Sequence, residues 1–106
     1  MRGVYISTED KNNLHMLTPE TLEYLQKAAK IFGIKKMILF GSCLRKPENE
    51  AGDIDLAIEG LKKLSLPYFV GELLMAKELK KQVDIVDLSD KAPINHIILD
   101  EGVVIY

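Results

Sequence analysis

Apolar residues recur at regular intervals along most of the chain, and the first interval is typical of a helix. Its start is indicated by Thr18-Pro19-Glu20, because Thr caps a helix, Pro fits the first turn and Glu suits the positive end of the helix dipole. Apolar residues then follow at spacings of three and four, up to a terminating Gly33: Leu22, Leu25, Ala28, Ala29 and Phe32. The pattern predicts one amphipathic helix before Gly33.

Three further stretches have the character of strands. Residues 34–40 (IKKMILF) form the first, which Gly41-Ser42 ends, and residues 83–88 (VDIVDL) form the third. Between them, residues 53–59 (DIDLAIE) alternate, with apolar side chains on one face and Asp53, Asp55 and Ala57 on the other. The polar residues 43–52 are expected to form a loop, with room for one helical turn after Ser42.

Two more helices and a last strand complete the predicted order. The second helix should run from Pro67 to about Lys81, and residues 93–101 fit a short helix that Gly102 ends. Residues 103–106 should be a short strand. This order predicts an α/β (α+β) protein, with a small mixed sheet packed with helices. The apolar residues around the start of the second helix are expected in the core, and any that prove exposed become candidates for a partner surface: Leu64, Leu66, Tyr68 and Phe69.

Composition narrows the class of protein. The chain has 106 residues, 47% of them hydrophobic, which suits a single domain over residues 1–106 with a loosely held N-terminal arm over 1–17. No apolar run approaches the roughly 18 residues of a membrane span, and no signal-peptide core precedes the domain. A formal charge of −2 argues against binding to duplex DNA. One cysteine, Cys43, suits the reducing cytoplasm, and we expect it to be a loop residue.

Aspartates inside predicted strands are the first candidate chemistry. Asp53 and Asp55 are two residues apart, so their side chains leave the same face of a strand. Two carboxylates that close repel each other unless a cation lies between them or one takes a proton. The third strand adds Asp84 or Asp87, which lie three residues apart on opposite faces that are both apolar, so the pattern alone leaves the choice open. Three converging carboxylates indicate Mg²⁺.

Two other interpretations of these aspartates deserve comparison. An edge strand could carry Asp53 and Asp55 as a solvated face. A calcium loop of the EF-hand type is excluded, because Leu56-Ala57-Ile58 continues a strand where such a loop needs oxygen ligands and glycine. Gly41-Ser42 favours the magnesium interpretation, because glycine at a strand end lets a phosphate approach the backbone and Ser adds a hydroxyl donor. A phosphate-binding turn that faces a metal site is typical of enzymes that catalyse phosphoryl or nucleotidyl transfer.

The spacing of these residues resembles a known family. Gly41-Ser42, ten residues and then Asp53-Ile54-Asp55 are similar to the GS-x10-D-x-D signature of minimal nucleotidyltransferases in the DNA polymerase β superfamily. The resemblance covers residues 18–106 and implies a polymerase β-like fold. Two departures stand out: Gly52 where the family often has Ser, and Lys46-Pro47 where it often has Gly.

The resemblance also implies roles for individual residues. Asp53 and Asp55 would bind two Mg²⁺ ions and, through them, a nucleoside triphosphate. Asp84 would supply the third carboxylate, while Gly41 and Ser42 would contact the triphosphate. Arg45 matches the basic position of a longer GS-x-x-R form, where it pairs with an acid or a phosphate.

The family resemblance implies a function as well. Such a protein transfers a nucleoside monophosphate, here AMP from ATP, to a hydroxyl group. Small members are typically antitoxins encoded beside a HEPN-domain toxin, and can adenylylate a tyrosine of that partner, so a homo- or hetero-oligomer is expected. The alternative is a non-catalytic antitoxin that neutralises its partner by complex formation. His15 and His96 are expected at the surface or in helix packing. Lys77, Lys80 and Lys81 are expected to form a solvated face at the end of the second helix, and the alternative is a basic patch near the triphosphate or the partner.

Overall fold

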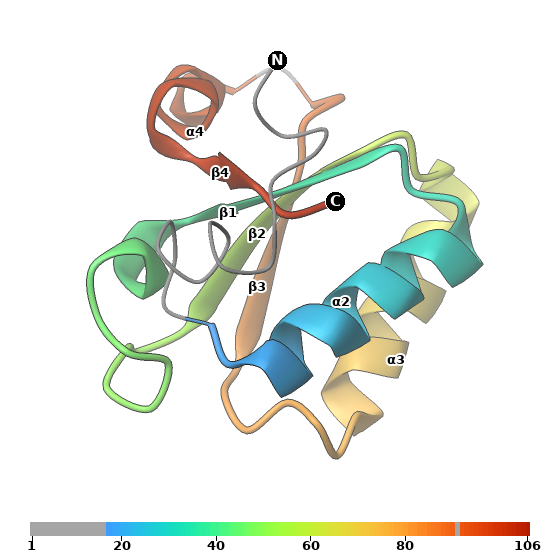
Figure 1. Cartoon of the computed structure of the whole chain (residues 1–106). Helices are drawn as coiled ribbons and strands as arrows, with labels where there is room; N and C mark the ends of the chain where they lie inside the picture. Colours follow the sequence, from blue (N-terminus) through green and yellow to red (C-terminus); the bar gives the residue numbers. More distant parts are fainter. Residues whose placement is uncertain (1–16, 91) are drawn as a thin grey trace.

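The computed structural model describes residues 17–90 and 92–106, which form one mixed sheet with helices on both of its faces (Figure 1). Residues 1–16, which include His15 and most of the expected arm, lie outside the described residues. The elements are α2 (Pro19–Phe32), β1 (Lys36–Phe40), the 3-10 helix η1 (Gly41–Leu44), β2 (Ile54–Glu59), the 3-10 helix η2 (Lys63–Ser65), α3 (Leu66–Met75), β3 (Val83–Asp87), α4 (Ile94–Glu101) and β4 (Val103–Val104). The predicted order of helices and strands is confirmed.

The four strands lie in the order β3-β2-β1-β4. β1 pairs antiparallel with both β2 and β4, whereas β2 and β3 are parallel and are connected through η2 and α3. Parallel neighbours need a crossover connection of this kind, because a tight hairpin can only join antiparallel strands. The sheet is therefore mixed, as the sequence predicted.

Helix α2 has the ends that its sequence predicts. The Thr18 hydroxyl oxygen accepts a hydrogen bond from the Thr21 backbone N–H at 3.2 Å, and Pro19 takes the first helical position. Gly33 ends the helix in the left-handed conformation at φ 75°, which residues with a Cβ rarely adopt. Leu17, the last residue of the expected arm, is buried in the core.

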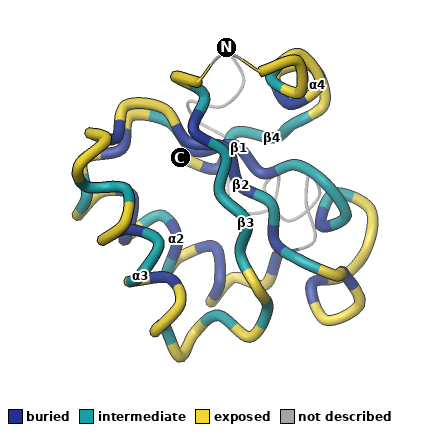
Figure 2. Tube along the Cα trace, turned by 180° about the vertical axis from the view of Figure 1, so that it is seen from behind, coloured by how far each residue is buried: buried dark blue, intermediate teal, exposed yellow. Residues whose placement is uncertain are grey.

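Alternation along β2 separates two packed layers. Ile54, Leu56 and Ile58 are completely buried against α2 and α3, in the larger core cluster. On the opposite face, Ala57 packs with Ile38 of β1 and Ile98 of α4 in a smaller cluster. Figure 2 shows the outer sides of the helices exposed and the strands mostly buried or half-buried. Asp55, at the start of β2, is half-buried on this second face.

The second helix is shorter than predicted. α3 ends at Met75, where Ala76 turns to extended backbone, so Lys77, Lys80 and Lys81 lie in the connection to β3 rather than on the helix. The residues after Met75 have good helical propensity, but tertiary contacts override it. Leu79 packs against the core, and the Gln82 carbonyl accepts a hydrogen bond from the Ile54 N–H at 2.9 Å. Both contacts are made after the chain has left the helix.

The core prediction around the start of α3 is partly wrong. Phe69 is completely buried and Leu66 half-buried, but Leu64 and Tyr68 are 88% and 75% exposed. Only one stripe of α3 faces the sheet, and Phe69 and Leu73 fill it, four residues apart. Leu64 and Tyr68 lie outside that stripe and contact solvent.

Within the described ranges, no helix has the length and apolar character to cross a lipid bilayer.

Candidate functional site

Strand register brings two of the predicted aspartates together. Asp55 of β2 is the register partner of Asp84 in parallel β3 and of Phe40 in antiparallel β1, so one row crosses three strands. Paired residues in a sheet project from the same face, which places the two carboxylates side by side. Asp53 lies immediately before β2, and all three aspartates are half-buried.

The site is rich in negative charge. Burial, followed by the charges of Asp84 and Asp53, raises the pKa of Asp55 above its ordinary value, and a hydrogen bond with the Asp84 side chain contributes in the same direction. This cluster therefore resists full ionisation without a compensating cation. The arrangement suits a ligand that brings positive charge.

Gly41 can only be glycine in this geometry. Its φ is +81°, and a Cβ at this position would overlap the Oδ2 of Asp55. The backbone at the start of η1 therefore lies against the carboxylate row. The Ser42 carbonyl accepts hydrogen bonds from the Arg45 and Lys46 N–H groups, both at 2.9 Å, and so closes the turn beside the site.

Cys43 is a core residue rather than the loop residue that the sequence predicted. It lies in η1, is completely buried, and its Sγ is 3.7 Å from the Asp53 carbonyl oxygen. Burial, then the charges of Glu48 and Asp55, raise the pKa of the thiol to about 11. Cys43 therefore remains a neutral thiol at physiological pH, and it packs in the core next to the backbone of Asp53.

Arg45 lies on the surface, directly after η1. Its Nη2 is 4.0 Å from the Oε1 of Glu101 in α4, and both side chains are largely exposed. An exposed pair at that distance contributes at most about 1 kcal/mol. The guanidinium is therefore available to a phosphate, although in the structure it pairs with an acid.

Asp87 has a different environment from Asp84. It is buried, and its Oδ1 accepts hydrogen bonds from the Ser89 backbone N–H at 2.9 Å and the Ser89 hydroxyl at 2.8 Å. Its Oδ2 lies 3.1 Å from the Lys63 ammonium. Burial alone would raise the pKa of Asp87, but these contacts lower it below its ordinary value. The structure brings Asp84, and not Asp87, beside Asp55.

One buried acid near the site was missed by the sequence analysis. Glu48, in the loop between η1 and β2, accepts hydrogen bonds from the Thr18 N–H at 3.1 Å and the Thr21 hydroxyl at 2.9 Å. The carboxylate thus lies at the N-terminus of α2, where the helix dipole favours negative charge. It ties the loop that links Ser42 to Asp53 to the helix layer. In the sequence, only the donors of the Thr-x-x-Thr start of α2 indicate that a carboxylate accepts hydrogen bonds there.

The donors of the site suit Mg²⁺ chemically. Mg²⁺ prefers oxygen ligands and keeps several waters, so two or three carboxylates suffice. Within residues 17–90 and 92–106, no three acid, His or Cys side chains are already gathered into a ready-made metal cage. The Asp55–Asp84 pair is nevertheless in register, with Asp53 close enough to raise the pKa of Asp55.

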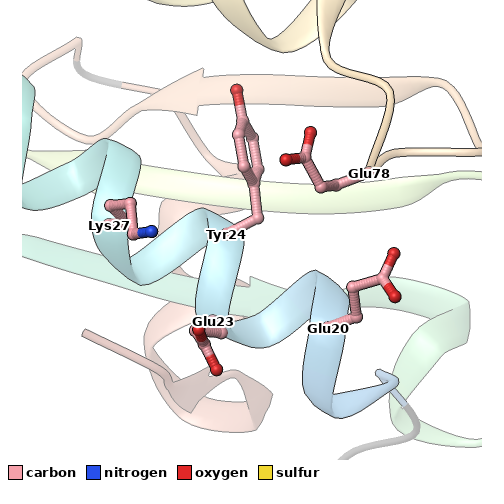
Figure 3. A pocket seen from close by; sticks show the side chains of 5 residues that line it. All are labelled: Glu20, Glu23, Tyr24, Lys27 and Glu78. Carbon is pink, nitrogen blue, oxygen red and sulfur yellow. The ribbon is translucent and has the colours of Figure 1, made fainter.

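A separate surface pocket lies away from the aspartates. Glu20, Glu23, Tyr24 and Lys27 of α2 line it with Glu78 of the α3–β3 connection (Figure 3). The Tyr24 hydroxyl donates to Glu72 at 3.0 Å. Burial, then the hydrogen bond to Glu72, raise the pKa of Tyr24 to about 12. The pocket belongs to the outer side of the helix layer, whereas the aspartates lie on the other face of the sheet.

Comparison with known proteins agrees with this geometry. Residues 20–106 match the sequence model of the family described as "Polymerase beta, Nucleotidyltransferase". The chain belongs to this family. As a member of the polymerase β nucleotidyltransferase family it is a nucleotidyltransferase, and the expected fold is confirmed. The metal-binding and nucleotide-binding roles of its individual residues stay predictions.

Solved structures with a similar fold include the crystal structure of a mutant of the toxin–antitoxin MntA-HpeT, with a TM-score of 0.61 and 18% sequence identity. The match covers 80% of this chain and 71% of that chain. Comparison with curated protein sequences gives no significant match.

Proposed function

We propose that this nucleotidyltransferase transfers AMP from ATP to a tyrosine hydroxyl of a HEPN-domain partner, and that it acts as the antitoxin of the pair in the cytoplasm. The observation that carries the proposal is the row of Asp55 and Asp84 beside the backbone of Gly41. Like charges in register repel each other, and either a bound cation or a proton on one carboxylate relieves that repulsion; we infer the cation. The similarity to a toxin–antitoxin structure supports the choice of partner.

Each predicted residue has a task in this reaction. Asp53, Asp55 and Asp84 would hold two Mg²⁺ ions, which when bound neutralise the triphosphate and lower the pKa of the attacking hydroxyl. Gly41 lets the phosphates approach the backbone, while Ser42 offers its hydroxyl as a donor. Arg45 would exchange its weak contact with Glu101 for a phosphate oxygen, which is a better partner for a guanidinium.

An isotope-transfer experiment tests the proposal. The chain is incubated with its HEPN-domain partner, Mg²⁺ and ATP labelled at the α-phosphate, and label on the partner is measured. We expect transfer with the native chain, and a loss of at least about 100-fold with Asp53→Asn or Asp55→Asn. Asp100→Asn, an exposed aspartate of α4, is the matched control and should transfer label normally. Neutralisation without label, unchanged in both site variants, would support the non-catalytic alternative instead.

We also propose where the partner binds. Leu64, Tyr68 and Met75 follow each other at spacings of four and seven residues along η2 and α3, and they are 88%, 75% and 83% exposed. Exposed apolar residues gathered on one side of a helix are typical of protein interfaces. We expect the HEPN-domain partner to cover this apolar face and to reach the aspartates, on the other face of the sheet, past the edge strand β3.

Replacing Tyr68 by glutamate tests the apolar face. A charge there must be desolvated on binding, so Tyr68→Glu should weaken the complex by roughly tenfold or more, as measured by titration calorimetry. The unfolding temperature should stay within a few degrees, because Tyr68 is exposed. Ile31→Glu on α2, which is 73% exposed, is the control and should bind normally. Equal weakening by both variants would contradict the assignment.

A further inference from the structure

Gln82 is connected to the carboxylate row twice. Its backbone carbonyl accepts the hydrogen bond from the Ile54 N–H at 2.9 Å, which begins the pairing of β3 with β2. Its side-chain Nε2 donates to the Oδ1 of Asp84 at 3.2 Å. Residues two apart on extended chain project to the same side, so the amide reaches the carboxylate without distortion. The backbone bond fixes the residue, and the side chain is left to contact Asp84.

The chemistry of this donor matters as much as its position. An amide N–H is neutral, so it holds one oxygen of the carboxylate without cancelling its charge. A lysine at this position would form an ion pair with Asp84 and compete with a cation. Asp87 has such a lysine, because Lys63 neutralises it. Among the described residues, Gln82 is the neutral side-chain donor to the three site aspartates.

We propose that Gln82 is a positioning residue: its amide holds the Asp84 carboxylate toward Asp55, so that a divalent cation meets two oriented ligands. This inference rests on the metal site of the proposed function. Side chains that orient metal ligands through hydrogen bonds typically change metal affinity by ten- to a hundredfold when removed. Because the hydrogen bond between Gln82 and Asp84 is exposed to water, we expect an effect at the lower end of that range.

Metal binding without nucleotide tests the inference directly. The probe is Mn²⁺ alone, titrated into the full chain and followed by electron paramagnetic resonance of the free ion. Gln82→Met removes the amide and adds no charge, and it should weaken Mn²⁺ binding about tenfold. The matched control is Gln26→Met, because Gln26 also donates one side-chain hydrogen bond, to the Ile105 carbonyl at 2.8 Å. That variant should bind Mn²⁺ like the native chain.

A second readout separates positioning from a structural role. In the transfer reaction, the Mg²⁺ concentration for half-maximal rate should rise about tenfold in Gln82→Met, while the rate at saturating Mg²⁺ stays within about twofold. If this variant unfolds, Gln82→Asn keeps an amide on a shorter stem and should show the same weakening.

Three outcomes distinguish the hypotheses. Native Mn²⁺ affinity in folded Gln82→Met and Gln82→Asn would overturn the role of Gln82 and leave the metal site intact. An equal loss of Mn²⁺ affinity in Gln26→Met would overturn it as well, since the effect would then be general. Failure of the native chain to bind Mn²⁺, or native binding by Asp55→Asn, would overturn the proposed metal site and this inference with it.

Discussion

Strand β3 carries two aspartates three residues apart, and the fold surrounds them in opposite ways. Asp87 is buried with a lysine and two serine donors, which together lower its pKa. Asp84 faces another aspartate, and its side-chain donor is the neutral amide of Gln82. The negative charge of Asp87 is neutralised by Lys63, whereas the charge of Asp84 has no cationic partner among the described residues. Groups left unbalanced inside a fold are expected at functional sites, because stability there is exchanged for activity.

The loop between η1 and β2 and strand β2 itself differ in the same way, since one carries an acid with hydrogen-bond donors and the other an acid beside acids. Glu48 is as buried as Asp87, and it is satisfied by the Thr18 N–H and the Thr21 hydroxyl at the N-terminus of α2. Asp55 has two acidic neighbours instead, and its pKa is raised. A buried acid with donors holds the structure together, whereas an acid among acids indicates a cation ligand. The environment of a carboxylate, and not its residue type, therefore assigns its role.

Replacing each β3 aspartate by asparagine, one at a time, should give the largest difference between the two positions, and it should appear in label transfer. Asp84→Asn should lower label transfer by at least about 100-fold, which is typical when a group that stabilises transition-state charge is removed. Asp87→Asn should keep transfer within about threefold per folded molecule, because its side chain contacts Lys63 and Ser89 rather than the site. Rates are compared after correcting for the folded fraction by circular dichroism. Loss of transfer in Asp87→Asn alone would assign the third carboxylate to Asp87.

Stability should change in the opposite order. Asp87→Asn loses charge-assisted contacts in a buried place and should lower the free energy of unfolding by about 2 kcal/mol. Asp84→Asn removes one of two facing like charges, so the fold should be unchanged or more stable without metal. Urea denaturation of both variants and the native chain measures the difference. A larger loss in Asp84→Asn than in Asp87→Asn would contradict the comparison.

Local signals were enough to predict much of this fold. Thr18, Pro19 and Gly33 define α2 through contacts within a few residues, and the alternation over residues 53–59 places Asp55 opposite the apolar face of β2. Such patterns act over a turn or a strand, so sequence alone carries them. The spacing from Gly41 to Asp53 likewise indicates a compact site, because a short loop there joins the end of one strand to the start of its neighbour.

The features that sequence analysis missed depend on distant contacts. α3 ends at Met75 because Leu79 and Gln82 are held by the core and by β2, which no local propensity reveals. The choice between Asp84 and Asp87 depends on the register of β3 with β2 and on the approach of Lys63. Both aspartates lie among the same alternating apolar residues, so only strand pairing distinguishes their environments.

The smallest expected difference is in how the unfolding free energies of the native chain and of Asp87→Asn depend on acid pH. Since the pKa of Asp87 is lowered in the fold, its ionised form stabilises the protein above the ordinary aspartate pKa of about 4, and this contribution disappears as the pH falls through the lowered folded value. The difference in unfolding free energy between the native chain and Asp87→Asn should therefore be constant from pH 7 to about pH 5, and should shrink at lower pH. Lys63→Met removes one of the contacts that lower this pKa, so the same trend should appear with a smaller amplitude. Urea denaturation at a series of pH values measures it, and a difference that grows toward low pH would mean that Asp87 is not held as an anion.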